Sequence, residues 1–185
     1  MTGYAVATRR TASAGVWGMG ILIASEAALF GAFIATYFYL RFHSVVWPPP
    51  GFPEPAWVGP VVSVAVLASS SFPVALAWRR VRAGRVAAAF VVQAAYFAYV
   101  GHDFHGQLQA HGIGENAYTS IYYTLLGTDH AHVFAGLLLD LWLLGKLTRG
   151  LTPYRVNATR AVGWYWHFVN VLSIVVLATV LSARL

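Results

Sequence analysis

Five long apolar segments, separated by polar or proline-rich stretches, dominate the pattern of residues along the chain. A helix needs about 20 mostly apolar residues to cross a bilayer. The pattern therefore predicts five membrane-spanning helices, over residues 16–40, 57–78, 86–100, 118–147 and 162–181. The third is the shortest and carries Gln93, and its pattern allows extension at either end.

Four connectors join these segments. Residues 47–55 are rich in proline, which lacks an amide donor and restricts the residue before it, so we expect an extended connector there. Residues 77–85 are expected to form a tight cationic turn. Residues 102–116 are expected to form a polar loop, and residues 150–160 a basic one.

Composition places the chain in a membrane. Hydrophobic residues make up 58% of it and charged residues 10%, with a mean hydropathy of +0.62, whereas soluble domains carry about 25% charged residues. We expect an all-α membrane bundle in which residues 1–185 form a single transmembrane domain. The absence of cysteine excludes disulfides and thiolate metal sites. The net charge of +6 does not indicate nucleic-acid binding, because the bases cluster between the apolar segments.

The twelve basic residues divide unevenly between the two sides of the predicted bundle. The side that holds the N-terminus has ten of them, Arg9, Arg10, Arg79, Arg80, Arg82, Arg85, Lys146, Arg149, Arg155 and Arg160. The other side has two, Arg41 and Arg184. Because cytoplasmic loops are enriched in Lys and Arg, this split predicts a cytoplasmic N-terminus, an external C-terminus and an odd number of spans.

Three acidic residues fall inside the predicted spans: Glu26, Asp129 and Asp140. A charged side chain in hydrocarbon is costly, so each acid is either functional or hydrogen-bonded to a neighbouring helix. Asp140 lies near the end of its span and could instead reach Lys146 or water. Glu26 shares a helix face with mostly apolar side chains, which are those of Leu22, Leu29, Phe33 and Tyr37.

Helical periodicity gathers polar residues into one stripe on each of the last two spans. In the fourth span the stripe contains Asp129, His132, Gly136 and Asp140, and it should face protein. Asp129 and His132 have the i, i+3 spacing that allows a direct bond. In the fifth span Trp164, His167, Asn170 and Ile174 share a face, and we expect His167 and Asn170 to contact polar groups of neighbouring helices.

Histidine-based cofactor sites are weaker alternatives. His102, His105 and His111 could hold zinc loosely in an exposed loop, although a solvated loop is favoured. His132 and His167 could sandwich a haem if they faced one another at matched depth. Nothing resembles a phosphate loop or a catalytic serine arrangement, so we predict no catalytic residue and no metal ligand in this chain.

Four segments, in order along the chain, carry motifs of one known family. The most specific is Trp164-Tyr165-Trp166-His167-Phe168-Val169, which matches a Trp-Tyr-Trp-His-Phe-Val motif. The others are Ser25–Phe33, similar to a Ser-Glu-x-x-x-Phe-x-x-Phe helix, Gln93–Phe97, similar to a Gln-x-x-Glu-Tyr segment, and Tyr118–Leu137, which ends in His-Val-x-x-Gly-Leu. With these motifs the chain resembles subunit III of the haem–copper respiratory oxidases. The first two of the family's usual seven helices are absent, as in its five-helix members.

The resemblance implies an accessory role without catalysis. It implies that the chain holds neither haem nor copper, that it packs on subunit I, which holds both, and that it meets other subunits, including subunit II. It also implies a V-shaped cleft filled by phospholipid and a multi-pass position in a bacterial cytoplasmic membrane. Glu26 corresponds to the family's buried, carbodiimide-reactive carboxyl, associated with proton uptake. The aromatic residues that could line the lipid cleft are Phe30, Phe33, Tyr37 and Trp164.

The sequence also departs from the family pattern. Asp129 and His130 stand where histidine and glycine are usual, Asn170 stands where aspartate is usual, and Ser173 where tryptophan is common. Tyr96 replaces the glutamate of the Gln-x-x-Glu-Tyr segment. A quinol oxidase or nitric oxide reductase complex is therefore an alternative setting. A small haem-binding cytochrome and a proton-coupled transporter are further alternatives from the intramembrane histidines and acids.

Overall fold

The computed structural model describes residues 14–52, 56–79 and 82–184, and all regular elements within them are helical. In chain order these are α1 (Ala14–Phe42), α2 (Val58–Ser69), α3 (Ser71–Arg79), α4 (Ala83–Ala110), α5 (Ala117–Leu147), α6 (Pro153–Leu181) and the 3-10 turn η1 (Ser182–Arg184). Five of the helical segments, with α2 and α3 counted as one, are long and apolar enough to cross a membrane. The predicted five-span bundle is therefore confirmed.

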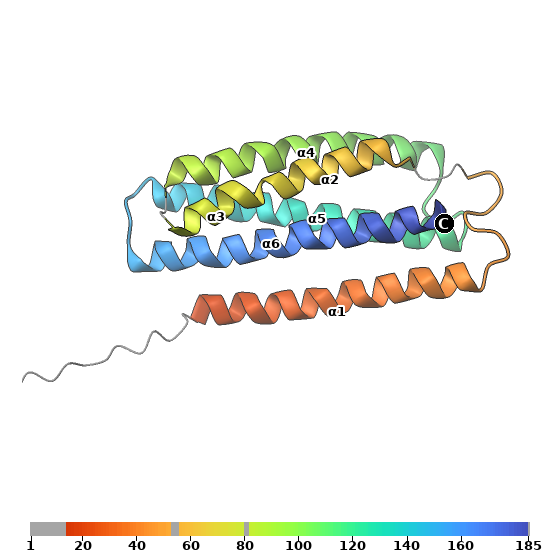
Figure 1. Ribbon diagram of the computed structural model, residues 1–185, viewed down its shortest axis with the longest axis horizontal. Coiled ribbons are helices and arrows are strands. Elements are labelled where there is room, and N and C mark those ends of the chain that lie inside the picture. The colour runs from red at the N-terminus through yellow and green to blue at the C-terminus, as the bar shows by residue number, and fades with distance from the viewer. Residues whose placement is uncertain (1–13, 53–55, 80–81, 185) are drawn as a thin grey trace, which may run out of the picture.

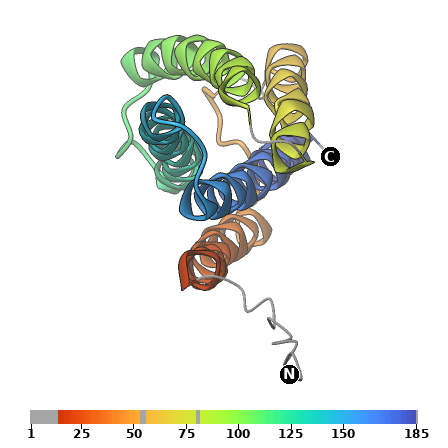
Figure 2. The same ribbon diagram turned by 90° about the vertical axis from the view of Figure 1, so that its left-hand side faces the viewer.

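Helices α5 and α6 form the centre of the bundle (Figures 1 and 2). Helix α4 packs on α5, while α2 and α3 pack on both α4 and α6. Helix α1 lies on the opposite side of the central pair and contacts only α5 and α6 among the described helices. It is thus the least integrated span, and only Phe30 and Tyr37 of its side chains are buried.

The second span is broken where the sequence suggested one helix over residues 57–78. Helix α2 ends at Ser69, and α3 begins at Ser71. Pro73 has no amide hydrogen to donate to the carbonyl one turn back, so it interrupts the hydrogen-bond ladder at this point. The break turns the Ser70 and Ser71 side chains toward the rest of the bundle, where they bond residues of α4 and α6.

Two predicted loops are shorter than expected, because helices extend into them. The third span, expected at 86–100, is helical to Ala110, so most of the predicted loop 102–116 is wrong. Its final turns are held by side-chain pairs one turn apart, such as Gln107 Nε2 donating to Asp103 Oδ2 at 2.7 Å. Helix α6 begins at Pro153 instead of 162, because the Thr152 hydroxyl accepts from the Arg155 amide and proline suits a first helical position.

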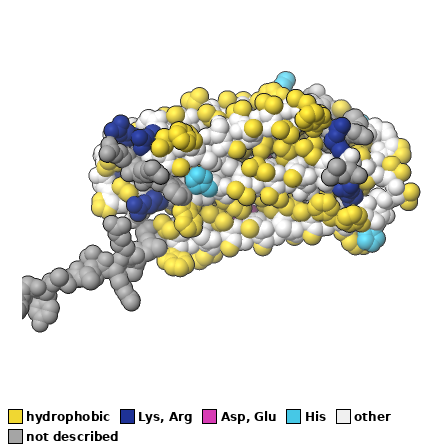
Figure 3. Space-filling view, in the orientation of Figure 1, with side chains coloured by type: hydrophobic (Ala, Val, Ile, Leu, Met, Phe, Trp, Pro, Cys, Tyr) yellow, Lys and Arg dark blue, Asp and Glu magenta, His cyan; other side chains and the backbone are white. Residues whose placement is uncertain are grey.

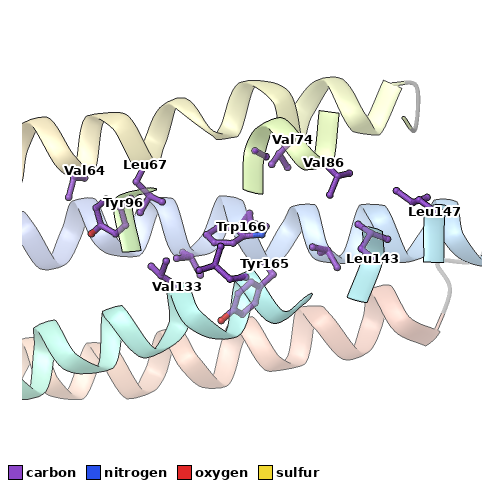
Figure 4. Close-up of a cluster of buried hydrophobic side chains, with 14 residues drawn as sticks. Val64, Leu67, Val74, Val86, Tyr96, Val133, Leu143, Leu147, Tyr165 and Trp166 are labelled. Carbon is purple, nitrogen blue, oxygen red and sulfur yellow. The ribbon is translucent and has the colours of Figure 1, made fainter. Parts of the chain in front are cut away.

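Buried apolar side chains fill the space between α2–α3, α4, α5 and α6 (Figure 4). Trp166 is completely buried in this cluster, and it lines a small cavity together with Val74 of α3 and Val86 of α4. A second cluster joins α1 to the central pair, through Phe30 and Tyr37 packed against residues of α5 and α6. The core thus extends along the whole bundle instead of forming one central sphere.

The outer surface is suited to lipid. Figure 3 shows an apolar belt along the bundle, with Lys and Arg side chains gathered at its two ends. The connector between α5 and α6 and the start of α4 share one end, which is the end that carries most of the described bases. Arg41 and Arg184 lie at the other end. Arg9, Arg10 and Arg80 lie outside the described residues.

Candidate functional site

Glu26 of α1 is hydrogen-bonded to His132 of α5, 106 residues away in sequence. The Glu26 Oε2 to His132 Nε2 distance is 3.0 Å, and the two side chains are 25% and 15% exposed. The other ring nitrogen, Nδ1, lies 2.8 Å from the Thr128 carbonyl oxygen. A carbonyl oxygen only accepts, so Nδ1 carries a hydrogen and donates it.

This geometry makes Glu26 and His132 a pair that shares one proton. With Nδ1 protonated, either Glu26 is a carboxylic acid donating to Nε2, or Glu26 is a carboxylate accepting from a doubly protonated imidazole. The net charge of the pair is zero in both forms, which suits a position inside the membrane. Moving the shared proton across a single 3.0 Å hydrogen bond therefore requires no net charge to enter the bilayer.

The surroundings fix His132 in place. The ring of Phe30 packs edge-on against the imidazole, with 5.2 Å between ring centroids. The Tyr165 hydroxyl of α6 donates to the His132 backbone carbonyl at 2.8 Å. The pair thus sits where α1, α5 and α6 meet, and it supplies a polar contact between α1 and the rest of the bundle.

The Asp129 carboxyl group is hydrogen-bonded to a residue of α6 and not to His132. Its carboxylate oxygens lie 2.9 and 3.1 Å from the Ser173 hydroxyl, and the residue is almost fully buried. The suggested i, i+3 bond to His132 is wrong, because the two side chains diverge around α5, His132 toward α1 and Asp129 toward α6. Ser173 was not singled out from sequence as a partner, although it lies on the same face of α6 as Asn170.

Asp140 is buried at the α5–α6 interface, and it does not bond Lys146, whose ammonium lies over the Trp142 ring instead. Within the described part of the chain, neither its Oδ2 atom nor Trp166 Nε1 makes a hydrogen bond of good geometry, although the two side chains lie close enough to interact. Both residues line a cavity of about 20 Å³. The other lining residues are mostly apolar, and a space of this size has room for about one water molecule.

A third polar group joins α6 to the break between α2 and α3. Asn170 Nδ2 donates to Ser71 Oγ at 2.7 Å, and His167 Nδ1 lies 3.3 Å from the same oxygen. Gln93 of α4 and Asn170 both reach Ser70 Oγ at 3.3 Å. The expected contacts of His167 and Asn170 with other helices are thus present. The run of three serines before Pro73 was the signal that could have identified their partners.

The two histidines suggested for haem do not face one another. His132 bonds Glu26 on α1, whereas His167 approaches Ser71 on α3, on the other side of the central helix pair. Within the described residues, no group of three or more His, Cys, Asp or Glu residues could hold a metal ion. His102 and His105 lie on α4 and not in a loop.

The four aromatic residues suggested for a lipid cleft have different environments. Phe30 and Tyr37 are buried in the cluster that joins α1 to α5 and α6. The Tyr37 hydroxyl also accepts from Trp47 Nε1 at 3.1 Å, which fixes the connector after α1. Phe33 is half-buried, and Trp164 is 47% exposed. Lipid contact at Phe33 and Trp164 stays a prediction.

The fold and these contacts define a multi-pass helical membrane protein whose buried polar groups bond neighbouring spans. The sequence comparisons then identify the family. The chain belongs to the cytochrome c oxidase subunit III family, whose model matches residues 4–182. Members of this family are membrane subunits of haem–copper oxidases in the respiratory chain.

Similar proteins come from more than one kind of oxidase. Cytochrome c oxidase subunit 3 of Thermostichus vulcanus is 31% identical over 171 residues, covering 86% of this chain and 83% of the relative. Cytochrome bo(3) ubiquinol oxidase subunit 3 of Pseudomonas aeruginosa is 31% identical over 176 residues, covering 89% and 83%. Heme-copper oxidase subunit I+III of Aeropyrum pernix is 30% identical over 172 residues, covering 83% of this chain and 21% of that longer protein.

Proposed function

We propose that this chain is an accessory, non-catalytic subunit that packs directly on subunit I of a terminal respiratory oxidase and stabilises it. The Aeropyrum pernix relative supports direct contact, because it is named as a joined subunit I+III and this chain matches only 21% of its length. In this proposal, haem and copper reside in partner subunits and electron transfer takes place there. The complex lies in a bacterial cytoplasmic membrane, and subunit II is a further member.

The orientation of the chain follows from its bases. The connectors at residues 77–85 and 150–160 carry most of the Lys and Arg residues and face the cytoplasm in this proposal. The C-terminal end of α6 and the proline-rich connector then face the outside. Helix α1, which is held by α5 and α6 alone among the described helices, leaves most of its apolar surface available for subunit I or phospholipid.

The observation that carries a proton-related role is the hydrogen bond between Glu26 and His132. Glu26 is 12 residues into α1, about 18 Å along its axis, which places it well inside a bilayer. Because proton transfer within the pair keeps its net charge at zero, the pair can take part in proton exchange next to the surface that α1 presents. We infer that the pair supports proton uptake by subunit I, and that bound phospholipid beside α1 keeps the site dry.

Substitution of Glu26 tests this role in the assembled oxidase. Glu26→Gln keeps a hydrogen-bonding side chain but removes the exchangeable carboxyl proton. We expect this variant to assemble, and to lose proton uptake or turn over fewer times before inactivation. Glu115→Gln, at the other described glutamate, is the control, because Glu115 lies in the connector before α5. If both variants matched the parent oxidase in every turnover and pumping assay, the proton-related role would be refuted.

Co-purification tests the accessory role separately. The chain is tagged in its native membrane, solubilised gently and analysed by reduced-minus-oxidised spectroscopy and mass spectrometry. We expect haem absorption that travels with a larger subunit I and is lost when this chain is isolated. Haem that stayed with the isolated chain, or a preparation without subunit I, would contradict the proposal.

The electron donor of the complex differs between the oxidases named for two of the relatives. The relative from Thermostichus vulcanus is named as a cytochrome c oxidase subunit and the one from Pseudomonas aeruginosa as a ubiquinol oxidase subunit, and both are 31% identical to this chain. A quinol oxidase is therefore the alternative setting. Assays of the same purified complex with reduced cytochrome c and with quinol distinguish the two.

A further inference from the structure

A cavity of about 260 Å³ lies between α2, α4, α5 and α6. Its outer part is lined by the start of α2, the end of α4 and the end of α6, so it lies at the end of the bundle opposite the basic connectors. Its inner part reaches Asp129 and Ser173. It is separate from the Glu26–His132 pair, which lies on the α1 side of α5.

Asp129 lies deep in the membrane-spanning region. It is 12 residues from the start of α5, which corresponds to about 18 Å along the helix axis. Ser173 lies 8 residues before the end of α6, or about 12 Å. A cavity that connects this depth to the end of the bundle spans a large part of one leaflet, because the hydrocarbon core is about 30 Å thick.

One face of α4 lines this cavity with a polar side chain at every turn. Tyr96, Tyr99, Asp103 and Gln107 all contribute to the lining, at spacings of three and four residues. Asp103 is exposed at the outer end, and Tyr96 is buried at the inner end. Gln107 is already bonded to Asp103 and Tyr122. An acyl chain in this space would still place the exposed Asp103 carboxyl and the hydroxyls of Tyr96 and Tyr99 against hydrocarbon, which is unfavourable, whereas water can bond these groups.

Ser173 cannot satisfy the Asp129 carboxylate alone. Its hydroxyl has one hydrogen, yet it lies within bonding distance of both carboxylate oxygens, at 2.9 and 3.1 Å. The Asp129 carboxyl group therefore keeps acceptor capacity toward the cavity that it lines. The titratable groups on the cavity lining are Tyr96, Tyr99, Asp103, Tyr122 and Asp129, and none of them is a base. This lining favours a positively charged or neutral occupant over an anion.

We propose that the cavity is a water-filled inlet, open to the side opposite the basic connectors, that admits hydronium and small cations as far as Asp129. The Asp129 carboxyl then exchanges its proton with that side of the membrane. The inlet and the role proposed for Glu26 rest on different contacts, because Asp129 bonds Ser173 of α6, whereas Glu26 of α1 bonds His132.

The three intramembrane acids thus differ in access. Glu26 lies at the α1 interface and is partly exposed at the bundle surface. Asp140 is enclosed beside a cavity of about 20 Å³. Of the three, only Asp129 lines the larger cavity.

Cysteine substitution tests the inlet cleanly, because the chain has no cysteine of its own. Ser173→Cys places a thiol at the inner end, and Ser63→Cys places one on the α2 wall of the same cavity. Ser70→Cys is the matched control, because Ser70 is completely buried and does not line the cavity. The parent complex is made cysteine-free or its other thiols are blocked, and sealed vesicles of known orientation are treated with small membrane-impermeant methanethiosulfonates.

These reagents react with the thiolate, which forms only where water reaches the sulfur. We expect Ser63→Cys and Ser173→Cys to react from the side of the C-terminus, and Ser70→Cys to react at least about tenfold more slowly. A cationic reagent should react faster than an anionic one at both cavity positions. Asp103→Asn should slow the cationic reagent by up to about fivefold and speed the anionic reagent by a similar factor, so their ratio should fall by up to about 30-fold; fivefold is the factor that one unit charge about 4 Å away contributes in water.

Each contrary outcome overturns the proposal. Unreactive thiols at both positions 63 and 173, in complexes that assemble and turn over normally, would mean that lipid or a partner subunit fills the cavity. Reaction only from the side of the basic connectors would show that the cavity opens to the opposite side from the one proposed. Faster reaction with the anionic reagent would refute the proposed preference for cations. The outcome does not depend on the Glu26→Gln assays, so failure of one proposal leaves the other standing.

Discussion

Helices α5 and α6 meet closely where Gly136 faces the indole of Trp166. A Cβ atom at position 136 would lie 2.6 Å from Trp166 Cζ2 and 2.9 Å from both Cε2 and Cη2. Carbon atoms pack at about 3.5–4.0 Å, so Gly136→Ala requires the two helices to separate by about 1 Å. The ring cannot give way instead, because it is rigid and completely buried.

The expected cost follows from that displacement. Overpacking a well-packed core destabilises a protein by about 1–3 kcal/mol, and a gap of 0.5–1 Å forfeits about a quarter to a half of each dispersion contact along the interface. Alanine also raises the helix propensity of the site by up to about 1 kcal/mol. Gly145→Ala isolates that propensity effect, because it lies on the same helix with nothing within 4 Å of its added Cβ.

We therefore expect Gly136→Ala to be less stable than Gly145→Ala by about 1–3 kcal/mol. Pulse proteolysis of the tagged chain in the purified complex, over a denaturant series, measures the difference as a shift of the unfolding midpoint. Gly136→Ala should also release this chain from the complex more readily on heating. Equal midpoints for the two variants would show that the α5–α6 interface adapts freely, and the close-packing argument would be refuted.

Three further changes test other parts of the fold by the same assay. Asn116→Ala removes the capping box that Asn116 and Thr119 form at the start of α5 and should cost about 0.5–2 kcal/mol; no change would contradict the capping role. Leu125→Ala creates a cavity where the side chain is completely buried and should cost about 2–5 kcal/mol, while Leu138→Ala, half-exposed on the same helix, should cost far less. Asn170→Ala removes the hydrogen bonds to the α2–α3 break and should lower the free energy of unfolding by about 0.6–2 kcal/mol. An unchanged unfolding midpoint would contradict this expectation.

The hydropathy pattern predicted the five spans correctly, but it misplaced the ends of several helices. An apolar run ends where the lipid ends, but backbone hydrogen bonds continue wherever side chains allow a helix. The last turns of α4 are polar, with Gln107 bonded to Asp103, and the sequence pattern therefore predicted a loop there. The break at Ser70 was missed because Pro73 stands in an otherwise apolar run and hydropathy ignores the amide that proline lacks.

Periodicity predicted which polar residues face protein but not what they bond. Asp129 and Asp140 are buried as the stripe on the fourth span required. Their partners lie on other helices, and the Glu26–His132 bond joins residues 106 positions apart. Such a pairing depends on the rotation and depth of two helices, and a periodic pattern on each helix alone defines neither. The i, i+3 spacing therefore suggested Asp129 as the partner of His132, although the nearer choice in space is on α1.

The departures from the family pattern become coherent once they are placed in the fold. Tyr96, Asp129 and Ser173 are three positions where the chain departs from the pattern that the resemblance implies, and all three line the same cavity. Serine is far smaller than the tryptophan common at position 173, and its hydroxyl supplies the hydrogen bond that Asp129 requires. Replacing a bulky ring by a small donor beside a buried acid creates space and polarity together. All three residues therefore act at one place in the bundle, where the cavity reaches an acid inside the membrane.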